Sequence, residues 1–298
     1  MGCLNSTMKM SKARDYILLH LIVLIFGFTG ILGKLITLDS DSLVWYRMMI
    51  ASLGLVIYAL IAGKQQELRS TPIGKLVVIG AIIAVHWITF FEAINQSNVS
   101  VALATMSSTS LFVAVFTPLF ERKLFRRYEI FLGLLAIAGL VMIFGFETHY
   151  ITGIVLALIS SALAAVFTLA NAQLVKKHGP VGISTYELLF GALVLTIYLA
   201  FTGKFNASFW EVSNMDWLWL ILLALVATSF AFVISVEVMK RLSPFTVSIS
   251  VNLEPIYAIL LALLIFGESE EMSYGFYIGA ALILVTIFAN AYLKRRIG

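Results

Sequence analysis

A glutamate followed directly by a proline, Glu254 and Pro255, lies halfway along an apolar segment of the chain. If that segment crosses a membrane, an unpaired carboxylate there is costly, so we expect Glu254 to be protonated or paired. Pro255 lacks an N–H and leaves the carbonyl oxygen of Val251 without its helical partner. The pair predicts a polar break in a helix, which lipid tolerates only where it lines a cavity or is covered by protein. Its role is either solute contact or proton coupling, or else an interhelical hydrogen bond that stabilises the fold.

A histidine, His86, lies at nearly the same depth in another apolar segment. An imidazole changes protonation between about pH 5 and 8, so His86 and Glu254 together are candidates for proton coupling through a relay. The alternative is a neutral imidazole that is hydrogen-bonded to a neighbouring helix.

Aromatic, hydroxyl and amide side chains at similar depths are suited to contact a bound solute. Aromatic rings stack on flat or cationic molecules, and hydroxyl groups hydrogen-bond amino and carboxyl groups. The aromatic residues could instead pack in the core or contact lipid, and the serines could instead allow helices to pack closely. The candidate solute-binding residues are Phe28, His86, Trp87, Phe90, Ser107, Ser108, Asn171, Asn252, Glu254 and Tyr257.

Four further charges, Arg47, Glu92, Glu187 and Glu237, lie near the ends of apolar segments. Arg47 and Glu92 are close to ends that would share one face of a membrane, where they are expected either to pair or each to extend to the interface. Glu187 and Glu237 lie near the other face. All four are candidates for gates, and a structural role is the alternative.

The composition of the 298-residue chain excludes a soluble globule, because 61% of its residues are hydrophobic, 12% are charged and its mean hydropathy is +1.00. It predicts an all-α membrane protein. One cysteine, Cys3, supports neither a disulfide nor a thiolate metal site, so we expect no metal and no cofactor. No catalytic motif is present, and Glu254 has no second carboxylate at its depth, so we do not expect an enzyme.

Ten apolar stretches reach the roughly 20 residues that a membrane-crossing helix needs. The connections between them are short and leave no room for a soluble domain. The spans are expected at 16–36, 43–62, 73–94, 99–119, 129–146, 152–175, 181–201, 217–239, 245–266 and 274–292.

Basic residues predict the direction of the spans, because lysine and arginine are retained in cytoplasmic loops. Apart from Lys34, Lys204 and Arg47, all of them fall in the two terminal segments or in the even-numbered turns between spans. Both termini are therefore expected in the cytoplasm of a multi-pass inner-membrane protein. This placement accounts for the net charge of +4 without a nucleic-acid partner.

A weak internal repeat divides the chain into two units. Asn98–Phe112 aligns with Pro244–Ala258, and each half contains five expected spans. Because five is odd, the second unit enters the membrane from the opposite face, an inverted arrangement used by carriers that hold a substrate near the bilayer centre. An old duplication retained for stability is the alternative. We expect a cytoplasmic tail at 1–15, five-helix repeats at 16–146 and 147–292, and a cytoplasmic tail at 293–298.

The fifth and tenth spans are almost purely aliphatic at their centres, so we expect them at the periphery. The spacing of Gly275 and Gly279 on the tenth span lets another helix approach closely. That helix belongs either to the same subunit or to a second one, which leaves a homodimer open.

A run of residues in the second half, Leu253–Tyr257, continues to Gly267-Glu268 and then to Tyr274 and Gly279. This pattern resembles the signature of the EamA-type branch of the drug/metabolite transporter superfamily.

The first half resembles the same unit more loosely. Pro118, Glu121 and Gly133 are in place, but Ser108-Thr109 stands where the second half has Glu-Pro. The resemblance covers essentially the whole chain in two copies. It implies a ten-helix exporter or uptake carrier for small metabolites and no particular substrate.

The sequence thus predicts a secondary active transporter that moves small organic metabolites, amino-acid-like or aromatic, across the inner membrane by alternating access. Its partners would be a small-molecule substrate and the lipid bilayer. A multidrug or organic-cation exporter is the alternative within transport. The short relatives that export cations carry an acidic residue in their first span, and the first and sixth spans here have none, which disfavours it. A non-transporting membrane receptor or scaffold is the alternative from another class.

Overall fold

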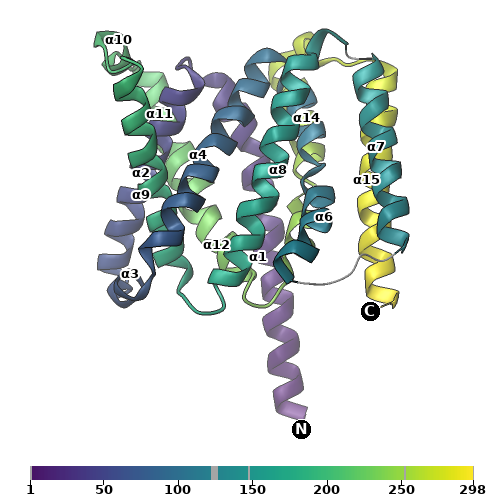
Figure 1. The fold of residues 1–298 in the computed structure, drawn as a ribbon, viewed down its shortest axis with the longest axis horizontal. Helices are drawn as coiled ribbons and strands as arrows, with labels where there is room; N and C mark the ends of the chain where they lie inside the picture. The colour runs from purple at the N-terminus through teal and green to yellow at the C-terminus, as the bar shows by residue number, and fades with distance from the viewer. Residues whose placement is uncertain (1, 122–126, 147, 252, 298) are drawn as a thin grey trace.

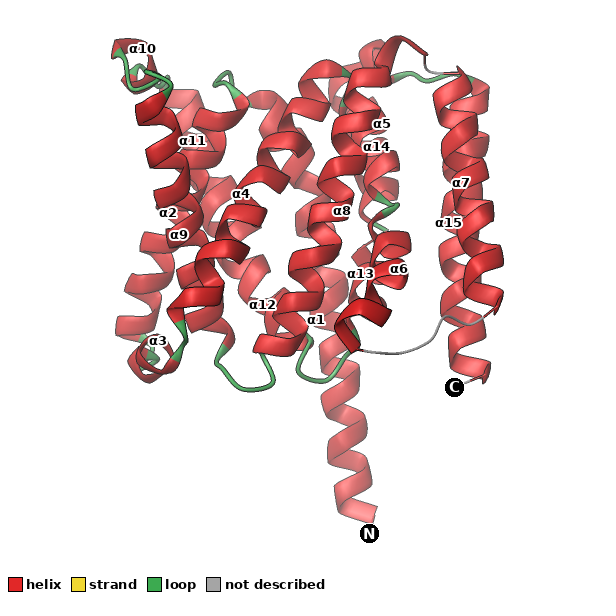
Figure 2. Cartoon of the chain, in the orientation of Figure 1, coloured by secondary structure: helices red, strands yellow, loops and turns green. Residues whose placement is uncertain are grey.

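The computed structural model describes residues 2–121, 127–146, 148–251 and 253–297, and this part of the chain is helical with no strand (Figure 2). Helix α1 begins and helix α15 ends at the same end of the bundle, which is called the lower end after its place in Figure 1. The opposite end is called the upper end. The helices are α1 (Gly2–Leu35), α2 (Ser40–Ile61), α3 (Gln65–Ser70), α4 (Ile73–Gln96), α5 (Val99–Met106), α6 (Thr109–Glu121), α7 (Arg127–Phe146), η1 (Thr148–Tyr150), α8 (Ile151–Leu174), α9 (Pro180–Phe201), α10 (Ala207–Trp210), α11 (Asn214–Ile221), η2 (Leu222–Phe230), α12 (Ala231–Val238), α13 (Pro244–Val251), α14 (Glu254–Phe266), η3 (Gly267–Glu270) and α15 (Tyr274–Ile297).

Seven segments of the described chain are long and apolar enough to cross a membrane, and they coincide with the first four expected spans and with the sixth to the eighth. Shorter apolar stretches, Leu134–Ile143 and Tyr274–Thr286, fall on the fifth and tenth expected spans. The ninth expected span, 245–266, is divided between α13 and α14. The chain is thus an all-helical, multi-pass membrane protein.

The first helix is longer than expected, because α1 begins at Gly2 and continues without interruption into the first span. Its N-terminal part projects beyond the lower end of the bundle in Figure 1. The chain has no glycine or proline between Gly2 and Gly27, so nothing in the sequence interrupts the helix once it has formed. The segment 1–15, expected as a tail, is therefore helical from residue 2.

Two helices are broken near their middle. The break expected at Glu254 is confirmed, since α13 ends at Val251 and α14 begins at Glu254. Pro255 lies in the first turn of α14, where the missing N–H removes no helical hydrogen bond. A second break, at Ser107 and Ser108, separates α5 from α6. The sequence did not predict it, although it occupies the aligned position in the first half.

Helices α7 and α15 pack mainly on each other at one side of the bundle, as Figure 1 shows. Their crossing is at Gly139 and Gly279. A Cβ atom on Gly279 would lie 2.7 Å from the carbonyl oxygen of Gly139, so the two backbones leave no room for a side chain. Gly279, one of the two glycines noted on the tenth span, therefore serves a contact within one chain.

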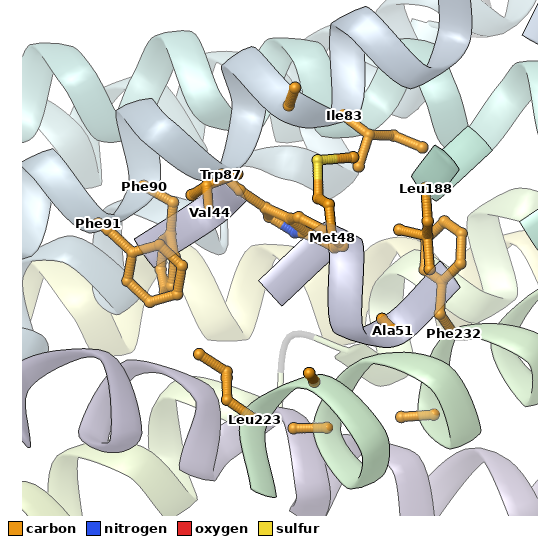
Figure 3. Close-up of a cluster of buried hydrophobic side chains, with 14 of the residues drawn as sticks. Val44, Met48, Ala51, Ile83, Trp87, Phe90, Phe91, Leu188, Leu223 and Phe232 are labelled. Carbon is orange, nitrogen blue, oxygen red and sulfur yellow. The ribbon is translucent and has the colours of Figure 1, made fainter. Parts of the chain in front are cut away.

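Helix α4 crosses the centre of the bundle and packs against both α8 and α9. Gly191 of α9 lies so close to α4 that a Cβ atom there would be 2.7 Å from the carbonyl oxygen of Gly80. This close approach holds the next turns of α4 in the core, where its large apolar side chains are buried (Figure 3). The cluster drawn there includes Val44, Met48, Ala51, Ile83, Trp87, Phe90, Phe91, Leu188, Leu223 and Phe232.

Candidate functional site

A cavity of about 140 Å³ lies inside the bundle. Side chains of α1, α2, α4, α5, α6, α8, η2, α12, α13 and α14 line it, whereas α7, α9 and α15 contribute none of the described lining residues. Both helix breaks reach it, one through Ser107 and Thr109 and the other through Glu254 and Pro255. The irregular backbone of the chain therefore faces a hollow rather than lipid, as membrane proteins require.

The wall of the cavity that α2 contributes carries a buried charge, Arg47, whose side chain is 2% exposed. Its Nε donates a hydrogen bond to Oγ1 of Thr228, at 2.6 Å. Its guanidinium carbon lies 3.8 Å from the centre of the Trp87 ring, a favourable cation–π distance. Its Nη1 has no hydrogen-bond partner among the described residues.

Thr228 is held by an unusual stretch of helix. Segment η2 is π-helical, and the hydroxyl of Thr228 donates to the carbonyl oxygen of Leu223, five residues earlier, at 2.8 Å. The same hydroxyl accepts the bond from Arg47. Because π-helical turns are rare and occur often at functional sites, this stretch marks the Arg47 side of the cavity as specialised.

Glu254 faces the same cavity from the N-terminus of α14. Within the described part of the chain its carboxyl group has no hydrogen-bonding side chain and no ion-pair partner. Arg47 and Glu254 both line the cavity, and within the described residues they form no ion pair with each other. The partial positive charge at a helix N-terminus favours a carboxylate there.

His86 also lines the cavity, and it is bonded to α8. Its Nδ1 lies 2.9 Å from the carbonyl oxygen of Ser160 and 2.8 Å from the hydroxyl of that residue. The serine hydroxyl donates to the backbone oxygen of His86, at 2.8 Å. Since a carbonyl oxygen only accepts, Nδ1 carries a hydrogen and Nε2 is the nitrogen left for other partners. The interhelical hydrogen bond expected as one alternative is therefore present.

The upper end of the bundle is closed by ion pairs. Lys34 of α1 donates to Glu270 of η3 at 2.7 Å, and the same carboxylate accepts from the first two backbone N–H groups of α5. Lys204 pairs with Asp41 at 2.5 Å, and this hydrogen bond raises the pKa of Lys204. Glu270 was not singled out from the sequence, where it is one of several acidic residues of an outer connection.

The lower end carries a second pocket, of about 490 Å³, whose rim is charged. Arg241 donates two hydrogen bonds to the buried carboxylate of Asp15, at 2.5 and 2.6 Å, and this bonding raises the pKa of Arg241. Glu237 pairs with Lys240 at 2.8 Å and lies 3.5 Å from Arg241. Lys64 is paired with a neighbouring glutamate, whose hydrogen bond raises the pKa of the lysine.

Comparison with known proteins identifies the chain. A sequence model of the EamA-like transporter family matches residues 14–145 and, a second time, residues 151–292. The chain belongs to the EamA-like transporter family. The EamA-like resemblance noted from the second-half motif is thus confirmed, and the protein is a transporter and not an enzyme.

Relatives of this EamA-like transporter are distant. The uncharacterized transporter YxxF of Bacillus subtilis is 21% identical over 95% of this chain and 90% of its own. The pseudopaline exporter CntI of Pseudomonas aeruginosa is 26% identical over 61% of this chain and 62% of its own. A crystal structure of another protein, 18% identical, superposes with a TM-score of 0.71 over 95% of this chain and 99% of its own, and so shares the fold.

The cavity of the EamA-like transporter brings together His86, Trp87, Phe90, Ser107 and Glu254 of the predicted solute-binding residues. These come from positions far apart in the sequence, and the contacts of α5 with both α4 and α14 bring them together. Within the described residues, no three His, Cys, Asp or Glu side chains lie close enough together to hold a metal ion.

Two predicted solute-binding residues point away from the cavity. Phe28 and Tyr257 are each 40% exposed, and neither is among the lining residues. On α1 the cavity is lined instead by Phe26 and Thr29, because neighbouring residues of a helix point about 100° apart. The Cβ atom of Tyr257 packs beside Gly27 of α1, which leaves its ring at the surface.

The other three predicted solute-binding residues are placed elsewhere or not described. Ser108 is buried beside the cavity-lining Ser107, and its hydroxyl has no partner among the described residues. Asn171 is buried and donates to a carboxylate oxygen of Glu187, at 3.2 Å. Asn252 lies outside the described residues.

The four gate candidates lie in four different settings. Arg47 lines the cavity, and the expected pairing with Glu92 is absent, since Glu92 accepts hydrogen bonds from Ser40 and Gln96, each at 2.8 Å. Glu187 is fully buried against Asn171, whereas Glu237 belongs to the ion pairs of the lower end. Arg47 does not extend to the interface either, and its guanidinium instead contacts Trp87 and Thr228 inside the bundle.

Proposed function

We propose that this transporter is a secondary active carrier that moves small organic metabolites, amino-acid-like or aromatic, across the inner membrane by alternating exposure of the central cavity. The observation that carries the proposal is a cavity lined by both broken helices and by two opposite charges, Arg47 and Glu254. Discontinuous helices whose ends face a midplane site are typical of secondary transporters.

The proposed architecture is ten spans in two inverted repeats of five. Helices α7 and α15 would be the fifth and tenth spans, and α13 with α14 would form the ninth. Two observations support it: the family model matches the chain twice, and the two helix breaks fall at aligned positions. Both ends of the helical chain lie at the lower end of the bundle, as an even number of spans requires (Figure 1). The basic residues in the loops at that end support a cytoplasmic location for it.

Alternating access in such a carrier is a rocking of one repeat against the other around a fixed site. The ion pairs at the two ends of the bundle would then form and break in turn. At the upper end these are Lys34 with Glu270, and at the lower end Arg241 with Asp15. A homodimer is not required, because α7 and α15 already cover each other within one chain.

Proton coupling would involve Glu254 and His86. Both face the cavity, and Nε2 of His86 is free of the hydrogen bonds that tie Nδ1 to α8. If His86 couples transport to protons, His86→Ala removes the dependence of flux on a pH gradient while solute binding persists. Flux in that variant that kept its full pH-gradient dependence would exclude this role.

Solute exchange by the purified protein in liposomes is the test of the whole proposal. Liposomes loaded with an unlabelled amino acid, nucleoside or organic cation are expected to take up the labelled form of at least one of them by counterflow. Glu254→Gln is expected to slow that exchange, and Tyr257→Leu, a change at an exposed residue of the same helix, should leave it unchanged. If a ligand stabilises the folded protein but the protein exchanges no solute, it would be a receptor or scaffold.

A further inference from the structure

We infer that Arg47 anchors the carboxylate of a small zwitterionic solute and that Glu254 receives its ammonium group. This rests on the proposed function, in that it narrows the solutes of the same cavity to amino-acid-like zwitterions with a compact apolar side chain. It gives Arg47, first considered as a gate, a binding role.

The guanidinium of Arg47 is poised for an acceptor that the described protein does not supply. Nε is satisfied by Thr228, and Trp87 stacks at 3.8 Å against one face of the group, so its plane is held in place. Nη1 is buried and has no acceptor. A buried cation with an unsatisfied N–H is costly, and a carboxylate with two oxygens fits the planar fork of donors better than any neutral group does.

Glu254 supplies the complementary group of the cavity. It has no ion pair within the described residues, so its carboxyl group is available to an ammonium group, whose charge favours the ionised form of the carboxyl. Arg47 and Glu254 both line the cavity and form no ion pair with each other within the described residues, so a solute that carries one charge of each sign can contact both. A solute with only one charge would pair with one of these side chains and leave the other unpaired.

A neutral hydrogen-bonding group, the hydroxyl of Thr29, also belongs to this cavity. The hydroxyl of Thr29 lines the cavity, is buried and has no partner among the described residues. It can bond either the carboxylate or the ammonium group of a solute, since a hydroxyl both donates and accepts.

The size and the remaining walls limit the apolar part of the solute. Phe90, Phe167 and Phe232 line the rest of the cavity, together with other apolar side chains. The volume of about 140 Å³ is close to that of an engineered protein cavity that takes up benzene. The apolar part is therefore no larger than one ring or one branched aliphatic chain.

A matched set of three probes tests the anchor. L-leucine carries both charges, 4-methylpentanoate carries only the carboxylate, and isoamylamine carries only the ammonium group. Calorimetric binding to the detergent-solubilised full chain is expected to rank L-leucine first. In Arg47→Gln, L-leucine and 4-methylpentanoate lose about tenfold or more in affinity, the loss of one charged hydrogen bond, and isoamylamine keeps its affinity. Glu92→Gln, which removes a charge outside the cavity, serves as the matched control and leaves all three affinities unchanged.

The reciprocal variant keeps the test decisive if Arg47→Gln does not fold. Glu254→Gln is expected to weaken L-leucine and isoamylamine and to spare 4-methylpentanoate. Tighter binding of isoamylamine than of L-leucine by the wild-type chain overturns the inference. So does equal weakening of all three probes by Arg47→Gln, or binding of none of them.

The same probes separate this inference from the proposed function. Binding in the expected order without counterflow of labelled L-leucine would overturn the carrier and leave the anchor standing. Counterflow of an organic cation by a protein that binds no carboxylate would overturn the anchor and leave the carrier standing.

Discussion

Replacement of Glu270 should strongly change how often the upper end of the bundle is open. Its carboxylate is fully buried and accepts three hydrogen bonds: from Lys34 at 2.7 Å, from the backbone N–H of Val99 at 3.1 Å and from that of Ser100 at 2.8 Å. It thereby joins the end of α1, the connection before α15 and the N-terminus of α5, where an anion is also favoured by the helix dipole.

The change Glu270→Gln keeps the shape and removes the charge. The amide oxygen can still accept from one backbone N–H, but the amide NH2 faces the other, so one buried donor loses its charged acceptor, at a cost of about 1.5–3 kcal/mol. The pair with Lys34, which is partly exposed, adds less than about 1 kcal/mol. The sum of about 1.5–4 kcal/mol acts only on states in which these contacts are formed. It should raise the ratio of upper-open to upper-closed molecules about tenfold or more.

Cysteine labelling measures this ratio, because the chain has one native cysteine, Cys3, which can be replaced by serine. A cysteine introduced at Ser107 reports on the cavity. A membrane-impermeant maleimide, added to the outside of whole cells, is expected to label it markedly faster when Glu270→Gln is present. The purified variant should also unfold at a lower temperature.

Glu268→Gln is the matched control, since it removes an exposed carboxylate two residues away. It should change neither the labelling rate at position 107 nor the unfolding temperature. If Glu270→Gln labelled at the rate of this control, the upper contacts would not be a gate. If it also melted at the control's temperature, the energetic argument itself would be refuted.

Three further predictions follow from packing and charge. Gly279→Leu forces α7 and α15 apart and should lower the free energy of unfolding by about 1–3 kcal/mol in a denaturant titration, whereas Gly74→Ala, with open space around it, should not. Asp15→Asn removes the charge and one of the two acceptor oxygens that bind Arg241 and should lower the melting temperature, and an unchanged melting temperature would show that solvent screens this pair fully. In equilibrium binding of L-leucine, Trp87→Ala should weaken affinity and Phe28→Ala should not, and the reverse order would mean that the solute does not occupy this cavity.

Several features of the protein could be predicted from local sequence because their causes are local. Mean hydropathy and segment length predict a multi-pass helical protein, and seven of the expected spans coincide with long apolar helices. The break at Glu254 was predictable because a proline removes a backbone donor wherever it stands. The break at Ser107 carries no such signal, since serine and threonine are tolerated in helices. It became visible only through the structure.

The sequence by itself determined that the chain folds in a lipid bilayer, where its helices lie along the chain, and the transporter family that its Glu-Pro motif indicated. Each of these depends on composition or on residues adjacent in the chain. Only the tertiary structure decided that Arg47 and Glu254 line one cavity, that Phe26 and not Phe28 lines it, and that Glu270 caps α5. An apolar helix in lipid is apolar on all sides, so its sequence does not say which face meets the protein. That face is chosen by partners far away in the chain, through contacts such as those at Gly80 and Gly191.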